Sequence, residues 1–141
     1  MFLLDTNIIS ESRKLGTARV DPVAARWLER TDLEATYLSA MTIFELERGV
    51  RQMERRDPMQ GLPLRRWLDD QVLAAYDGRI LPLSAAVARL CAGLHVPDPK
   101  SERDAWIAAT AIANDLTIVT RNVADFAGMG VALENPFAEG E

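Results

Sequence analysis

Hydrophobic residues fall into short runs separated by longer stretches with helical spacing. The short runs predict β-strands at 2–5, 35–38, 79–81, 117–120 and 131–133. The helical stretches predict helices at 22–30, 40–56, 64–76, 85–96 and 103–114. Strands joined by helical crossovers favour a parallel sheet covered on both faces. We therefore expect one α/β domain spanning residues 1–141, with three layers (α/β/α) and a central, mostly parallel sheet of four to five strands.

Residues that typically begin or end helices support these boundaries. Pro22 suits the first turn of a helix, Ser39 and Ser84 suit N-cap positions, and Gly78 suits a helix end. The two helices that flank residues 57–63 are expected to project as a hairpin.

Composition narrows the class of protein. A chain of 141 residues with 48% hydrophobic and 26% charged residues fits one ordinary globular domain. Cys91 has no partner for an intrachain disulfide and is expected to be a small core residue, while His95 suits a core or surface role better than a ligand role. The apolar start, residues 1–4, is too short for a signal peptide or a membrane span, so we expect a cytoplasmic protein without a membrane partner.

The net charge and the distribution of basic residues point in opposite directions on whether the protein binds nucleic acid. The net charge of −5 argues against broad attraction to a polyanion. Fourteen of the sixteen basic residues are nevertheless arginine, whose planar fork suits phosphate. Six of them cluster in one helical stretch and its successor: Arg48, Arg51, Arg55, Arg56, Arg65 and Arg66. This cluster is either a local nucleic-acid or partner surface, or a solvated helix face diluted by neighbouring acids.

The first strand ends at an acid. Residues 1–4 are apolar, and Asp5, Thr6 and Asn7 follow at once. In open α/β sheets, ligands bind at the carboxyl ends of the strands, so Asp5 is placed where chemistry occurs. The alternative is that one of these polar residues only caps the next helix.

Two further acids lie near helix starts. Glu45 lies off the apolar stripe of its helix and close to the end of the preceding strand, where its carboxylate can reach the same edge of the sheet. The alternative is that Glu45 faces solvent and pairs with a neighbouring residue of its helix. Asp104 shares a face with apolar residues of a nearly all-apolar helix, which directs its carboxylate over the sheet. Ser101 and Asp104 also resemble a capping box, and both roles are compatible.

A fourth group of polar residues follows the strand at 117–120. Thr120, Asn122 and Asp125 lie at or just past its carboxyl end, as Asp5 does after the first strand. Asn122 also suits a turn or a helix cap.

Three or four convergent carboxylates need a compensating cation, and hard oxygen ligands suit Mg²⁺ or Mn²⁺. An ion held there can lower the pKa of a bound water and stabilise charge on a phosphodiester. The sequence therefore predicts a metal-dependent phosphodiesterase site.

Four segments together resemble the signature blocks of PIN domains, most closely those of the VapC and FitB type of bacterial toxin–antitoxin ribonuclease. The resemblance spans nearly the whole chain and includes residues 134–137 at its end. The four segments are 3–10, 39–46, 104–111 and 119–126.

The resemblance implies a Mg²⁺- or Mn²⁺-dependent endoribonuclease toxin that is neutralised by a small cognate antitoxin and commonly dimerises. Asp5, Glu45 and Asp104 match the family's metal-binding acids. Asn122 stands where some members have an aspartate, so either Asn122 forms a weakened fourth site or Asp125 supplies the charge. Thr120 resembles the family's polar residue near the attacking water. The antitoxin is expected to be a small DNA-binding protein resembling VapB.

Two other functions remain open at this stage. One is a catalytically weak or inactive partner in an operator-binding complex, which the asparagine at 122 favours. The other is phosphoryl transfer through an aspartyl-phosphate, which fits less well because no Asp-x-Asp-x-Thr pattern occurs and no lysine ends a later strand.

Overall fold

The structure is a computed structural model that describes residues 1–137. Its centre is a five-stranded sheet in the order β3-β2-β1-β4-β5, and all paired strands run parallel. The expected three-layer α/β fold is therefore confirmed, with five strands. They are β1 (Phe2–Leu4), β2 (Thr36–Ser39), β3 (Ile80–Leu81), β4 (Thr117–Val119) and β5 (Leu133–Glu134).

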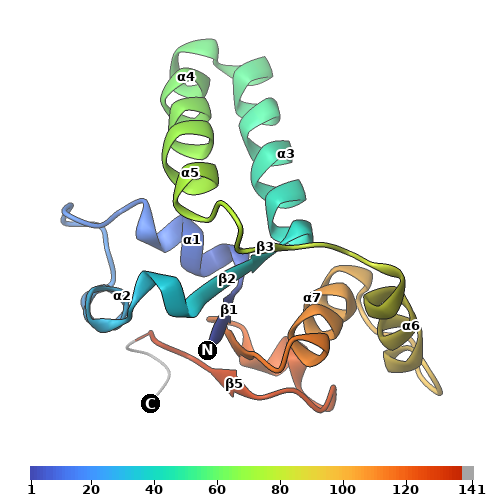
Figure 1. Ribbon diagram of the computed structural model, residues 1–141. Coiled ribbons are helices and arrows are strands. Elements are labelled where there is room, and N and C mark those ends of the chain that lie inside the picture. The colour runs from blue at the N-terminus through green and yellow to red at the C-terminus, as the bar shows by residue number, and fades with distance from the viewer. Residues whose placement is uncertain (138–141) are drawn as a thin grey trace.

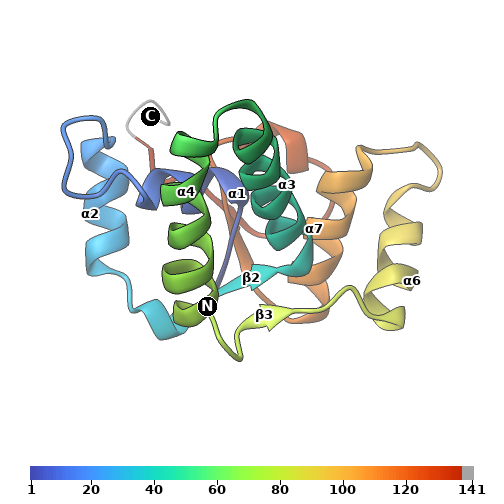
Figure 2. The ribbon, with the colours of Figure 1, turned by 90° about the horizontal axis from the view of Figure 1, so that it is seen from above.

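Helices cover both faces of this sheet, and α3 and α4 rise together beyond it as a hairpin (Figure 1). Seen from above, α7 lies between the strands and α6 (Figure 2). The α-helices are α1 (Thr6–Ser12), α2 (Pro22–Arg30), α3 (Ala40–Arg56), α4 (Pro58–Arg66), α5 (Leu73–Ala75), α6 (Ala85–Leu94) and α7 (Glu102–Ala113). Shorter helical segments are η1 (Leu33–Ala35), the π-helical η2 (Trp67–Val72) and η3 (Val123–Phe126).

Alternation along the strands divides the core between the two faces. Leu4 and Val119 point into a cluster with residues of α1, α2, α3 and η2, whereas Leu3 and Ile118 point to the face that α7 covers. Because successive strand residues face opposite sides, the adjacent residues Leu3 and Leu4 belong to different cores. A third cluster joins α6 to α7 through Cys91 and its apolar neighbours, as expected for a core cysteine.

Strand order fixes the place of the site. The chain moves from β1 to one side of the sheet through β2 and β3, then returns to β4 on the other side of β1. The carboxyl ends of β1 and β4 therefore flank a topological switch point, where α/β sheets bind ligands. Asp5 follows β1 and Thr120 follows β4.

Two expectations about helices need correction. No helix is predicted directly after the first strand, but α1 begins at Thr6, and Asp5 is its N-cap, accepting a hydrogen bond from the Thr6 N–H at 2.8 Å. Residues 58–63 were expected to be a connection, yet Asp57 alone links the hairpin, ending α3 and capping α4. Pro58 stands at the tolerated first position of α4, and Pro63 lies inside the helix.

Other boundaries agree with the sequence. The ranges 22–30 and 40–56 are helical as expected, and Ser39 and Ser84 cap α3 and α6. His95, expected inside a helix, instead follows α6, where its Nδ1 accepts from the Lys100 N–H at 3.0 Å. No helix within residues 1–137 is long and apolar enough to cross a membrane.

Arg65 of α4 clamps the hairpin to α3. Its two terminal nitrogens donate to both carboxylate oxygens of Glu47, at 2.9 and 2.8 Å, and its Nε lies 3.1 Å from Glu54 Oε2. These hydrogen bonds hold the pKa of Glu47 at about 2, below its ordinary value of 4.5. The guanidinium of Arg65 therefore stabilises the packing of α4 against α3.

This clamp predicts a pH-dependent stability. Because the pKa of Glu47 is lower in the folded than in the unfolded chain, its stabilisation is fully present above pH 4.5 and is lost as pH falls toward about 2. Glu47→Gln should therefore lower the melting temperature at pH 7. Near pH 2, where Glu47 of the wild type is protonated as well, the two melting temperatures should converge. Melting curves of both proteins across that range test this, and a gap that stays constant with pH would contradict it.

Candidate active site

The Asp5 carboxylate is fully buried at the end of β1. Its Oδ2 accepts hydrogen bonds from Thr120 Oγ1 at 2.8 Å and from Asn7 Nδ2 at 3.3 Å, and its Oδ1 accepts from the Thr6 N–H. Arg103 donates to the same Oδ1. Capping and site roles, which were alternatives in the sequence, are thus combined in one side chain.

Glu45 reaches the same place from α3. Its Oε1 lies 2.5 Å from Thr6 Oγ1, and its Oε2 accepts from Arg103 Nε at 2.7 Å. Its side chain is only 17% exposed, so Glu45 is not the solvent-facing glutamate of the alternative interpretation.

Asp104 comes from the first turn of α7. Ser101 caps this helix by accepting from the Asp104 N–H, as expected. The Asp104 carboxylate instead accepts from Arg103 Nη1 at 2.7 Å, so its side chain serves the site while its backbone serves the cap.

One guanidinium holds these three carboxylates together. Arg103 donates through Nε to Glu45, through Nη1 to Asp104 and through Nη2 to Asp5. The three acids belong to the ends or starts of three different elements, so the fold rather than local sequence creates the cluster. The cation that convergent carboxylates require is supplied here by the chain itself.

The ion pairs shift the pKa values of both partners. Burial raises the pKa of Glu45, but hydrogen bonds from Arg103 and Thr6 outweigh it, and the net effect is a lowered pKa. Burial likewise disfavours charge on Arg103, yet its bonds to Glu45 and the charge of Asp5 raise its pKa. Glu45 and Arg103 are therefore ionised together at neutral pH.

The residues after β4 divide into two groups. Thr120 is fully buried, donates to Asp5, and accepts from the Asn122 N–H at 3.0 Å, so it orients the Asp5 carboxylate. Asn122 lines the adjacent cleft. Asp125 is exposed on η3, and no hydrogen bond or ion pair in the described chain joins its side chain to the three acids.

An open cleft of about 430 Å³ lies beside the cluster. Glu45, Arg103 and Asn122 line it together with two further cationic side chains, Lys14 and Arg121. A site that combines carboxylates with nearby cations can bind a phosphodiester while holding a metal ion.

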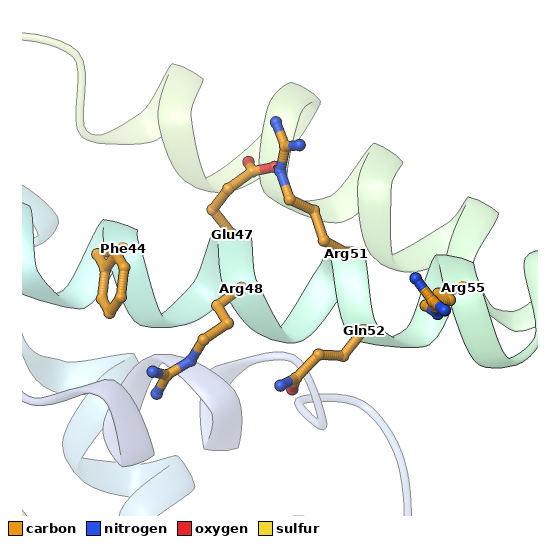
Figure 3. Close-up of a pocket in the computed structure, with 6 residues that line it drawn as sticks. All are labelled: Phe44, Glu47, Arg48, Arg51, Gln52 and Arg55. Atoms are coloured by element: carbon orange, nitrogen blue, oxygen red, sulfur yellow. The ribbon is translucent and has the colours of Figure 1, made fainter.

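A second hollow, of about 490 Å³, lies on the outer face of α3, next to Glu45 in the chain (Figure 3). Arg48 lies over the ring of Phe44, 5.0 Å from its centroid, and Arg51 pairs with Glu47 at 2.6 Å. Arg48, Arg51 and Arg55 are exposed, unlike Arg65. The arginine cluster predicted from sequence therefore separates into an exposed aromatic and basic face and a structural clamp.

The donor set fits a divalent metal ion. Three carboxylates from β1, α3 and α7 converge on one positive group, and carboxylate oxygens are the ligands that Mg²⁺ and Mn²⁺ prefer. As placed, no three acidic, histidine or cysteine side chains in residues 1–137 are gathered tightly enough to hold an ion. Arg103 lies between the three carboxylates and pairs with each of them.

Comparison with known proteins identifies the family. Residues 2–130 match the family model described as the PIN domain. The chain belongs to the PIN domain family. It is 34% identical to VapC ribonuclease Y4jK of Sinorhizobium fredii over 97% of this chain and 98% of that protein. It is 36% identical to Toxin FitB of Neisseria gonorrhoeae over 97% and 99% of the two chains.

Solved PIN structures agree with the fold. The structure resembles a chain in the crystal structure of FitAcB from Neisseria gonorrhoeae with a TM-score of 0.87 and 34% identity, covering 96% of this chain and 98% of that one. A chain of FitAB bound to a DNA fragment matches with a TM-score of 0.86. The fold of this chain is therefore shared with these chains over nearly its whole length.

Arg103 is the site residue that the sequence interpretation missed. It directly precedes Asp104, and neighbours in a helix do not face each other, so spacing gave no reason to join them. The available signal was an arginine in the first helical turn, where anions are favoured and cations are not.

Proposed function

We propose that this PIN domain is a Mg²⁺- or Mn²⁺-dependent endoribonuclease that hydrolyses RNA by attack of a water molecule on phosphorus. The observation that carries the proposal is the convergence of Asp5, Glu45 and Asp104 on a single cationic position at the switch point of the sheet. The naming of a full-length relative as a VapC ribonuclease supports RNA as the substrate.

In this proposal the three acids hold the ion, which when bound supplies a Lewis acid and a water of lowered pKa. Thr120 and Asn7 fix the orientation of Asp5 through hydrogen bonds to its Oδ2. Thr6 fixes Glu45 in the same way, so the ligands are preorganised by their neighbours.

Cations around the site suit a polyanionic substrate despite the net charge of −5. Lys14 and Arg121 line the cleft beside the acids, and the exposed arginines of α3 begin one turn from Glu45. Phe44 adds an aromatic surface on which an unpaired base could stack. These features favour single-stranded or looped RNA.

We also propose that the protein acts as the toxin of a toxin–antitoxin pair in the cytoplasm. Its relatives include Toxin FitB, and the matching crystal structures are of FitAcB and of FitAB bound to DNA. A small DNA-binding antitoxin resembling VapB is the expected partner, and the chain is expected in a homodimer or in a toxin–antitoxin hetero-oligomer.

Buried Asp5 argues against the aspartyl-phosphate alternative. A nucleophilic carboxylate needs an oxygen that the phosphoryl group can reach, whereas both oxygens of Asp5 accept hydrogen bonds inside the protein. The acids therefore suit metal binding better than covalent catalysis.

Cleavage of RNA by the purified protein tests the proposal. With MnCl₂ or MgCl₂, we expect single-stranded RNA to be cut, EDTA to stop the reaction, and single-stranded DNA of the same sequence to be cut poorly. Water attack leaves no cyclic 2′,3′-phosphate on the products, which mass spectrometry of the fragments checks. If no RNA is cleaved in a metal-dependent way, the chain is instead an inactive partner in an operator-binding complex.

A further inference from the structure

Arg103 takes the place of a cation among acids that are suited to bind one. Each of its three nitrogen atoms serves a different carboxylate, at 2.7 Å for Glu45 and for Asp104. An arginine that touches one acid is an ordinary ion pair, but one that uses its whole fork on three elements fills the site.

We propose that Arg103 is a built-in counter-ion that a divalent metal ion must displace, so that metal binding to this protein is an exchange. The inference rests on the metal site of the proposed function and adds a regulatory residue to it. Arg103 keeps the three acids neutralised while no ion is bound, and it competes with the ion for the same oxygens.

Arg103 in its present position and a metal ion cannot occupy the site at the same time. Mg²⁺ binds oxygens at about 2.0–2.1 Å, whereas the guanidinium nitrogens already lie at hydrogen-bonding distance from one oxygen of each acid. An ion held among those oxygens would sit against the guanidinium, and two like charges in a half-buried site repel. The three carboxylates can close on an ion only after the side chain has moved away.

A path for this movement is present. The Arg103 side chain is 30% exposed and lines the cleft of about 430 Å³, so its flexible stem can turn into the cleft. The backbone of Asp104 is held separately, because its N–H is bonded to Ser101 at the start of α7. The Arg103 side chain can therefore turn away without moving the helix start that carries Asp104. The cleft it enters is the proposed place of the phosphodiester, which a guanidinium binds well.

The test is Mn²⁺ titration by isothermal calorimetry without RNA, on the full chain and on Arg103→Gln and Arg103→Ala. We expect both variants to bind Mn²⁺ at least about tenfold more tightly than wild type, because the competent state no longer requires displacement of a side chain. Without metal, both should melt at a lower temperature than wild type, and Mn²⁺ should raise their melting temperatures more than that of wild type.

Arg89→Ala is the matched control, since Arg89 is an exposed arginine of α6 and its removal changes the net charge equally. It should alter neither the Mn²⁺ affinity nor the melting temperature. If Arg103→Ala fails to fold, Arg103→Lys, which keeps the charge but offers one nitrogen in place of three, should still bind Mn²⁺ more tightly than wild type.

Unchanged or weaker Mn²⁺ affinity in folded Arg103 variants overturns the exchange. The result is independent of catalysis, because no substrate is present. Tighter Mn²⁺ binding by the variants, together with no RNA cleavage by the wild-type protein, would leave the exchange standing and overturn the nuclease proposal alone. RNA cleavage by the wild-type protein, with equal Mn²⁺ affinities of wild type and variants, would support the nuclease proposal and overturn the exchange.

Discussion

Asp5→Asn is expected to reduce metal-dependent RNA cleavage by about a thousandfold or more, the scale seen when a preorganised electrostatic group is lost. Asparagine keeps the shape of the side chain but removes the charge that binds a cation. The protein should remain folded, because the amide oxygen of asparagine can still accept the hydrogen bond that the Thr6 N–H donates to Asp5 Oδ1. Initial cleavage rates with saturating Mn²⁺, together with circular dichroism, measure both effects.

Asp70→Asn controls for the loss of one negative charge, because Asp70 is exposed on η2 and outside the site. It should cleave at the wild-type rate. Equal activity of Asp5→Asn and wild type would show that the acids serve folding or partner binding instead. In the same assay, Asp125→Asn and Asn122→Ala decide the fourth position, since the variant that lowers the rate identifies the residue that completes the site.

Gly61→Ala is expected to destabilise the protein by about 1–3 kcal/mol, the usual cost of overpacking. A Cβ at this position would lie 2.7 Å from Glu54 Cα and 2.9 Å from Glu54 N, so backbone must move to admit it. The helix propensity of alanine favours the opposite outcome by up to about 1 kcal/mol, which makes the sign of the effect informative. Urea denaturation measures it.

Gly49→Ala is the matched control in the same hairpin. Gly49 lies within α3, and nothing lies within 4 Å of the Cβ it would gain. Its replacement should therefore stabilise the protein by about 0.5–1 kcal/mol through reduced backbone freedom in the unfolded chain. If Gly61→Ala also stabilised the protein, α3 and α4 would not be packed as closely as described.

The sequence was sufficient to predict the convergence of the acids. Carboxyl ends of parallel strands meet at one edge, so Asp5 and the residues after β4 were expected near each other, and Glu45 lies in the second turn of the helix that starts at that edge. It also predicted that a cation was needed. It could not predict that the cation is Arg103, because that depends on the rotamer of a long side chain and on three elements meeting.

The hairpin illustrates the other limit of the sequence. Gly61 and Pro63 are typical of a connection, and they led to the expectation of a loop before the second helix. In the structure Gly61 is required by the close approach of α4 to α3, and Pro63 is tolerated within α4. Tertiary packing thus overrode local propensity at both positions.

The position of β1 in the sheet has a consequence for synthesis of the protein. β1 is made first, yet one of its two neighbours, β4, extends to Val119 of a chain of 141 residues. Pairing over so long a separation comes late in folding, because loop closure must precede it. Thr120, which orients Asp5, and Asp104 also come from this last part of the chain. A growing polypeptide therefore cannot assemble the acid cluster until Asp104 and Thr120 have been synthesised, so the proposed metal site forms long after β1 has been made.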